Sequence, residues 1–148
     1  MSTPDFGILL GLAYQRFVIE LNESLAAQGF TGIKPTFGYV FRALGEQAMT
    51  TAQLAGRLQI TNQGMAKIVD DMTEAGYLEK NHDPADARVK LLSLSVRGHA
   101  ALRAARRFHA NFEQELGERK AATIRKLLTE IVAQGGPEDD LTRTLRPF

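Results

Sequence analysis

The feature that most constrains the fold is a pair of short helical patterns separated by a very short break near the middle of the chain. Thr50 and Gln53 have the spacing of a capping box, in which each side chain satisfies an unpaired backbone donor at the start of a helix. The pattern breaks at Gln59 and Ile60, and Thr61 then has the side chain of an N-cap for a second helix. Two short helices joined by so tight a turn predict a helix-turn-helix unit.

The hydrophobic period changes directly after this unit. Residues 77–82 and 88–94 have the pattern of two short strands, and residues 83–87 supply a polar turn between them. Ser95 then begins another helix as an N-cap. A helix-turn-helix unit followed by a hairpin predicts a winged helix-turn-helix, in which the hairpin is the wing.

Longer helical patterns lie on both sides of this unit. Apolar residues recur every three or four positions over residues 6–25, after a start signal at Thr3 and Pro4, and again over residues 124–131. A further helix is expected after Pro35. The expected fold class is therefore mainly α with a small β-hairpin, a six-helix winged helix-turn-helix with dimerisation helices from both termini.

A chain of 148 residues suits a single domain. We expect residues 33–97 to form the winged lobe, and residues 1–32 and 98–148 to form the dimerisation helices. Gly135-Gly136-Pro137 is expected to end the last helix. The apolar stripes of the terminal helices exceed what one compact lobe buries, which predicts a homodimer.

Composition excludes several other classes of protein. The chain has no cysteine, and hence no disulfide, thiolate nucleophile or thiol redox sensor. No apolar run reaches the ~18 residues that span a bilayer and no signal peptide is present, so we expect a cytoplasmic protein without a membrane partner. His82, His99 and His109 are scattered, so no metal or other cofactor is expected. Neither a nucleophile elbow nor a Gly-rich phosphate loop is present, so we do not expect an enzyme.

The net charge is only +1, but positive charge is concentrated in one segment. Residues 87–112 contain six Arg or Lys residues and no acidic one. A charge run alone usually marks a solvated helix face. Beside a helix-turn-helix and a hairpin, the same run favours contact with the DNA backbone.

The second helix of the pair is the candidate reader of DNA sequence. Its polar face presents Asn62, Gln63 and Lys67. Asn and Gln can pair bidentately with adenine and Lys can donate to guanine, and such a helix fits the major groove. Every amphipathic helix has a polar outer face, so this face indicates DNA binding only in combination with the wing.

The hairpin contributes a second set of candidate DNA contacts. Arg88 follows the turn directly and has the length to enter a narrow minor groove. Asp86 can hold Arg88 through a charge-assisted pair, although an ordinary exposed ion pair is the simpler alternative. Lys90, Arg97 and Arg57 are expected to contact phosphates, which position a protein without specifying sequence.

A resemblance to a known family is carried by residues 54–102, LAGRLQITNQGMAKIVDDMTEAGYLEKNHDPADARVKLLSLSVRGHAAL. This segment resembles the multiple-antibiotic-resistance regulator (MarR) family of bacterial transcription factors. The most specific match is the wing signature, Asp83-Pro84, Asp86-x-Arg88, Leu92-x-Leu94-Ser95 and Gly98.

The resemblance implies a role for each part of the lobe. Family members are generally homodimers that bind palindromic operators, often in response to small aromatic or anionic ligands. Arg88 would be the wing-tip arginine with Asp86 as its partner, and the segment Thr61–Lys67 would contact the bases. Gly64 and Ala66 lie within that segment, where the family commonly carries bulkier polar residues, and this departure bears on the number of base contacts but not on the fold.

Seven residues outside the recognition helix are candidate contacts for such a ligand. They combine aromatic rings with cationic or titratable groups: Tyr14, Phe17, Phe37, Phe41, Arg42, His109 and Phe112. The family pocket lies where the dimerisation helices meet the DNA-binding lobe. Aromatic residues at helical spacing are also typical of a core, so burial of these rings is the alternative.

These patterns predict a homodimeric, sequence-specific DNA-binding transcriptional regulator, and the resemblance implies that it is a ligand-responsive repressor of a palindromic operator. The alternative is a winged-helix module that serves dimerisation or protein contacts without recognising DNA. Asp70, Asp71 and Glu74 on the recognition helix favour that alternative, because they would face a polyanion.

Overall fold

The computed structural model describes residues 2–134, which form a mainly helical protein with one small hairpin. In chain order the elements are α1 (Phe6–Ala27), α2 (Pro35–Glu46), α3 (Thr51–Leu58), α4 (Asn62–Glu74), β1 (Leu78–Asp83), β2 (Asp86–Leu94), α5 (Val96–Leu116) and α6 (Glu118–Ala133). The expected fold class, mainly α with a small β-hairpin in a six-helix winged helix-turn-helix, is confirmed for the described residues. The expected helix end at Gly135-Gly136-Pro137 lies outside the described residues.

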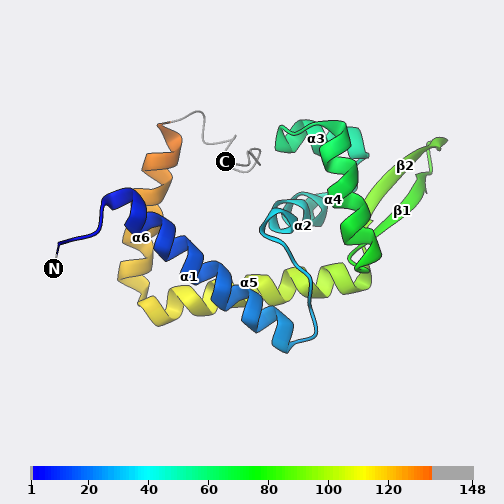
Figure 1. Ribbon diagram of the computed structural model, residues 1–148. Helices are drawn as coiled ribbons and strands as arrows, with labels where there is room; N and C mark the ends of the chain where they lie inside the picture. The colour runs from blue at the N-terminus through cyan, green and yellow to red at the C-terminus, as the bar shows by residue number, and fades with distance from the viewer. Residues whose placement is uncertain (1, 135–148) are drawn as a thin grey trace.

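The long helix α5 connects two parts of the molecule (Figure 1). At its N-terminal end lies the winged lobe, which consists of α2, α3, α4, β1 and β2. At its other end, α6 turns back from α5 and α1 packs along α5, and we call this part the helical end. Among the described residues, no helix combines the length and the apolar character needed to cross a membrane.

The core belongs mainly to the winged lobe. Its largest fully buried side chains come from α2, α3, α4, β2 and the residue before β1, and are Phe37, Val40, Leu54, Leu58, Met65, Val69, Met72, Tyr77 and Leu92. The predicted apolar face of the recognition helix is confirmed, since Met65, Val69 and Met72 are at most 1% exposed. This burial fixes which face of α4 is turned to solvent.

Local caps set the limits of the helix-turn-helix as the sequence predicts. The amide of Gln53 donates to Oγ1 of Thr50 at 3.1 Å, and the amide of Thr50 donates to Oε1 of Gln53 at 2.9 Å. Gln59 ends α3 in the left-handed region at φ 55°, and Thr61 Oγ1 then accepts the amide of Gly64 at 3.0 Å. Each such cap stabilises a helix by about 1 kcal/mol.

The hairpin pairs β1 with β2 in antiparallel register, from Leu78 opposite Leu94 to Asp83 opposite Asp86. β1 has the predicted length but lies one residue later than predicted, and β2 begins two residues earlier, because the ladder continues to Asp83 and resumes at Asp86. Met49, before α3, adds a bridge to the hairpin, and its backbone exchanges two hydrogen bonds of 3.2 and 2.7 Å with Leu92. This bridge ties the wing to the connection between α2 and α3.

The predicted start of the first helix is wrong by two residues. α1 begins at Phe6 with Asp5 in the N-cap position, and Asp5 makes no side-chain cap. The carbonyl oxygen of Asp5 accepts the amide of Leu9 at 2.9 Å, so the first helical turn closes there rather than at Thr3. Residues 2–5, before α1, are exposed.

Candidate nucleic-acid interface

The outward face of α4 carries unpaired polar side chains near its N-terminus. Asn62, Gln63 and Lys67 are all exposed, and none of them makes a side-chain hydrogen bond or ion pair within residues 2–134. The opposite face is anchored in the core, so α4 cannot rotate to hide them. These side chains are therefore available to an external partner.

The first turn of α4 is shaped by its cap. Thr61 is exposed, but its hydroxyl oxygen accepts the amide of Gly64. A Cβ added to Gly64 would lie 3.1 Å from that oxygen, so a side chain at this position would crowd the cap. A larger residue here would require the Thr61 hydroxyl to shift by a few tenths of an ångström.

Two carboxylates of α4 are paired with lysines from other elements. Lys80 Nζ on β1 lies 3.6 Å from Oδ1 of Asp70, and Lys34 Nζ before α2 lies 3.3 Å from Oδ2 of Asp71. These pairs neutralise much of the negative charge that counts against DNA binding, while Glu74 stays exposed. Sequence reasoning missed both lysines, since only the folded chain brings them to α4.

At the wing, Asp86 and Arg88 form the pair expected from their spacing. Nε and Nη2 of Arg88 donate to the two carboxylate oxygens of Asp86 at 3.1 and 3.2 Å. The backbone amide of Arg88 also donates to Oδ1 at 3.0 Å. These hydrogen bonds hold the pKa of Asp86 below its usual value. The bond from the Arg88 side chain contributes most, and the bond from the Arg88 amide contributes less.

This geometry presents the guanidinium to solvent in a fixed orientation. The Arg88 side chain is 90% exposed although its fork is held from one side by Asp86. Lys90 is exposed on the same strand. The wing therefore offers two cations beside the polar face of α4.

Arg57 and Arg97 differ from these two residues, because each reaches across to a partner on another part of the fold. Arg57 Nη2 donates to Oε2 of Glu46 at 2.7 Å, and this hydrogen bond lowers the pKa of the Glu46 carboxyl. Arg97 Nη2 donates to the carbonyl oxygen of Gly29 at 3.0 Å, at the far end of the hairpin from its turn.

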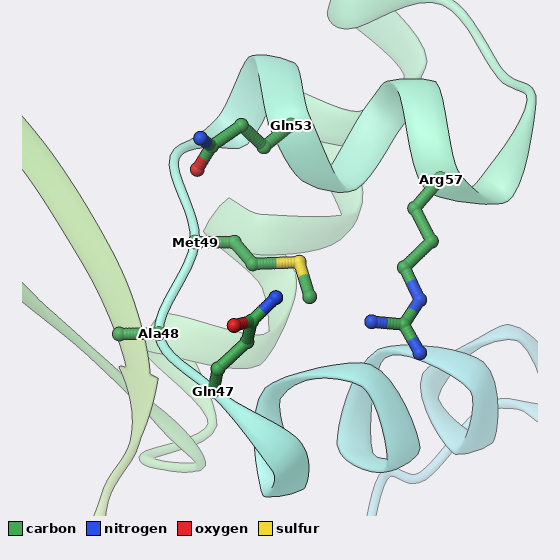
Figure 2. A pocket seen from close by; sticks show the side chains of 5 residues that line it. All are labelled: Gln47, Ala48, Met49, Gln53 and Arg57. Carbon is green, nitrogen blue, oxygen red and sulfur yellow. The ribbon is translucent and has the colours of Figure 1, made fainter.

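An open hollow lies between α3 and the connection that leads into it (Figure 2). It is lined by Gln47, Ala48, Met49, Gln53 and Arg57. Arg57 points from α3 toward α2, where it meets Glu46, and Gln53 is held by its capping box. The polar groups that line this hollow are thus largely committed to the fold.

Two of the predicted ligand contacts belong to the core instead. Phe37 is 2% exposed and Phe41 is 5% exposed, and the Phe41 ring packs edge-on against Tyr77 at a centroid distance of 5.4 Å. Both rings lie inside the winged lobe because they occupy the inner face of α2. Their burial agrees with the alternative interpretation of these rings, a packing role in the core.

Three other predicted ligand contacts do meet between α1 and α5. The Phe17 ring lies 5.0 Å from the rings of both His109 and Phe112, measured between centroids. Phe108, which was not among the predicted contacts, joins them at 5.4 Å from Phe17. We call Phe17, Phe108, His109 and Phe112 the aromatic cluster.

Charged groups surround the aromatic cluster. Burial lowers the pKa of His109, Arg125 and Arg42 lower it further, and Glu113 opposes them. Glu113 accepts a hydrogen bond from Arg125 of α6.

The remaining two candidates, Tyr14 and Arg42, are not part of the ring contacts of the cluster. Tyr14 is 59% exposed on α1, and Arg42 is exposed on α2. Burial raises the pKa of Tyr39, with a smaller contribution from Tyr14, which places these two tyrosines near each other.

The helical end exposes a large apolar surface. On α1 and α6 it consists of Phe6, Ile8, Leu9, Leu12, Tyr14, Ile19, Ile124, Leu127, Leu128, Ile131 and Val132, each at least 43% exposed. Such extended apolar surfaces mark interaction sites in proteins. Within the described part of the chain, no group of His, Asp or Glu residues has the arrangement of a metal site.

Comparison with known proteins agrees with this architecture. Residues 31–89 match the model of the MarR family. An uncharacterised protein of Mycobacterium bovis is 33% identical over 61 residues, which is 41% of this chain and 43% of that relative. The chain thus matches less than half the length of this relative.

Solved structures extend the likeness to most of the chain. A probable transcriptional regulator from Pseudomonas aeruginosa is 26% identical, with a TM-score of 0.65 over 86% of this chain and 96% of that one. A mutant of MarR from E. coli, solved in complex with operator DNA, is 21% identical, with a TM-score of 0.63 over 84% and 91%. The chain is thus similar to the MarR family over residues 31–89, and it has the winged helix-turn-helix fold of these regulators.

Proposed function

We propose that this protein is a homodimeric transcriptional repressor that binds a palindromic DNA operator in a sequence-specific way. The observation that carries the proposal is the unpaired polar face of α4, with Asn62, Gln63 and Lys67, beside a wing that presents a fixed Arg88. The operator complex of the E. coli MarR mutant, which has the same fold, supports it.

Each of these surfaces has the chemistry of one DNA groove. The N-terminal part of α4 carries amide and ammonium donors, which suit the edges of adenine and guanine in the major groove. Arg88 is long, exposed and oriented, which suits the narrow and electronegative minor groove. Lys90 supplies a phosphate contact that adds affinity without sequence preference.

The acidic residues of α4 favour the alternative, a winged-helix module that does not recognise DNA, less strongly than the sequence alone indicates. Asp70 and Asp71 are paired with Lys80 and Lys34, so the field that DNA meets there is close to neutral. The polar contacts of α4 are therefore not opposed by two free carboxylates.

Dimerisation follows from the apolar surface of α1 and α6. A symmetric partner that covers this surface would also place two copies of α4 about one DNA turn apart, roughly 34 Å, as a palindromic operator requires. Residues 1–32 and 98–148 would then be the dimerisation part, and residues 33–97 the DNA-binding part. Such a protein acts in the cytoplasm, where bacterial DNA lies.

The aromatic cluster is the proposed effector site. Its rings suit a small aromatic molecule, and Tyr14 and Arg42 nearby suit a polar or anionic substituent. Because α5 runs from this cluster into the winged lobe, a ligand that favours one arrangement of the two parts would change operator affinity.

Binding of labelled DNA at a series of salt concentrations tests the proposal. We expect the protein to select a duplex with an inverted repeat from a random pool, with an affinity that falls steeply as salt rises. An absence of binding to any duplex at low salt would favour the alternative, a winged-helix module that contacts only protein.

A further inference from the structure

One arginine organises the junction between the winged lobe and the rest of the molecule. Arg97, in the first turn of α5, donates from Nη2 to the carbonyl oxygen of Gly29 at 3.0 Å and to Oη of Tyr77 at 3.3 Å. Its guanidinium carbon lies 4.8 Å from the centre of the Tyr77 ring and 5.6 Å from that of Phe30. A single side chain thus joins the α1–α2 connection, the base of the wing and the start of α5.

Tyr77 is a rigid base for this arginine. It is completely buried, and its hydroxyl donates to the carbonyl oxygen of Thr31 at 2.8 Å while it accepts from Arg97. Its ring packs edge-on against Phe41 in the lobe core. The α1–α2 connection is therefore held at Gly29 by Arg97 and at Thr31 by Tyr77.

The backbone at the junction is equally constrained. Ser95 Oγ donates to the carbonyl oxygen of Gly76 at 2.5 Å, and the amide of Ser95 donates to the carbonyl oxygen of Tyr77 at 3.0 Å. A Cβ added to Gly98 would lie 2.1 Å from the Tyr77 carbonyl oxygen, so α5 and the base of the wing are in direct contact. The end of α4, the wing and α5 form one unit, to which the side chains of Arg97 and Tyr77 attach the α1–α2 connection.

We propose that Arg97 is a positioning residue that fixes the winged lobe relative to α1, and that it thereby sets the separation of the two recognition helices in the dimer. This inference rests on the proposed function and replaces the expectation that Arg97 contacts a phosphate. The planar guanidinium is required, because it donates to a carbonyl oxygen and a hydroxyl while its face lies on two rings. A lysine ammonium is a point charge that cannot reproduce this arrangement.

The critical variants are Arg97→Lys and Tyr77→Phe. The first keeps the positive charge, and the second removes only the hydroxyl that links Arg97 to Thr31. Arg103→Ala is the matched control, since Arg103 is exposed on the same helix and has no hydrogen bond or ion pair among residues 2–134.

The DNA experiment uses a duplex that the wild-type protein selects from a random pool, and the same duplex with one base pair inserted between the half-sites. We expect Arg97→Lys and Tyr77→Phe to bind the selected duplex about tenfold more weakly, as for the loss of one charge-assisted hydrogen bond. Both variants should also discriminate less between the selected duplex and the duplex with the inserted base pair. Their affinity should depend on salt concentration with the same slope as that of the wild type.

Two results would overturn the inference while leaving the proposed function intact. If Arg97→Lys bound like the wild type while Arg97→Ala lowered the salt slope by about one, Arg97 would be a phosphate contact. If the variants lost affinity equally for all duplexes and kept their spacing preference, the role would be purely structural. A wild-type protein that selects no duplex contradicts the proposed function itself.

Amide hydrogen exchange without DNA gives an independent readout. Exchange over residues 28–33 should rise in Arg97→Lys and in Tyr77→Phe, because the α1–α2 connection loses its attachment. It should stay unchanged in Arg103→Ala. If residues 28–33 exchanged in Arg97→Lys at the wild-type rate, the arginine would not hold the α1–α2 connection.

Discussion

Removal of the Asp86 carboxylate should weaken DNA binding, although it removes a negative charge next to a polyanion. Both oxygens of Asp86 accept hydrogen bonds from the Arg88 fork, at 3.1 and 3.2 Å. The Arg88 side chain is otherwise 90% exposed, so in Asp86→Ala it would sample many rotamers. Simple electrostatics predicts tighter binding by this variant, which is the opposite sign.

The magnitude follows from side-chain entropy. An arginine side chain carries about 2 kcal/mol of rotamer entropy, part of which is lost when it enters a groove. If the pair with Asp86 spares about 1 kcal/mol of that loss, each wing gains about fivefold in affinity, and a dimer about 25-fold. Arg88→Ala should weaken binding at least as much, chiefly for operators with A·T pairs at the wing positions.

Fluorescence anisotropy with the selected duplex measures these effects. Glu79→Ala is the matched control, because Glu79 is an exposed wing carboxylate without a hydrogen bond or ion pair in the described part of the chain. We expect Glu79→Ala to bind as tightly as the wild type or more tightly. The double variant Asp86→Ala/Arg88→Ala should bind about as weakly as Arg88→Ala, since the carboxylate then has nothing to orient. Tighter binding by Asp86→Ala would refute the orienting role of the aspartate.

Three further predictions concern folding and assembly. Gly98→Ala should lower the free energy of unfolding by about 1–3 kcal/mol or more in urea titrations, because its Cβ would lie 2.1 Å from the Tyr77 carbonyl oxygen; wild-type stability would contradict this contact. Leu127→Lys should shift the protein from dimer to monomer in analytical ultracentrifugation, whereas Val96→Lys, at the other end of the protein and 85% exposed, should leave the dimer intact. Burial lowers the pKa of His109, so the unfolded chain binds a proton at this histidine more readily than the folded protein does. The free energy of unfolding should therefore fall as the pH drops below 6.5, the ordinary pKa of histidine, and continue to fall through the lowered pKa of the folded state. Urea titrations at several pH values should show this dependence in the wild type and less of it in His109→Gln.

The features that the sequence predicts well are those set by neighbouring residues. The Thr50–Gln53 capping box and the Asp86–Arg88 pair depend on spacings of three and two residues. The recurrence of apolar residues every three or four positions on α4 likewise defines its buried face, because residues at this spacing point to the same side of a helix.

The features that the sequence does not reveal depend on how distant segments pack. Arg97 meets Gly29 across 68 residues, and Lys34 meets Asp71 across 37. No local pattern encodes these separations, so Arg97 has the sequence signature of any exposed cation. Periodicity places Phe37 and Phe41 on an apolar face, but only the packed lobe shows that this face is closed by core residues.

The sequence preference of Gln63→Ala tests the central claim most directly, because Gln63 is exposed on α4 and unpaired in the described chain. Binding of the wild type, Gln63→Ala and Lys90→Ala would be measured on a panel of operators that differ by one base pair in each half-site. We predict that Gln63→Ala loses discrimination at one symmetric position, by roughly 1–3 kcal/mol, and keeps its salt slope. Lys90→Ala should weaken binding to every operator equally and lower the slope of affinity against salt concentration by about one. A uniform loss of affinity in Gln63→Ala, with an unchanged order of preference, would contradict base recognition by α4.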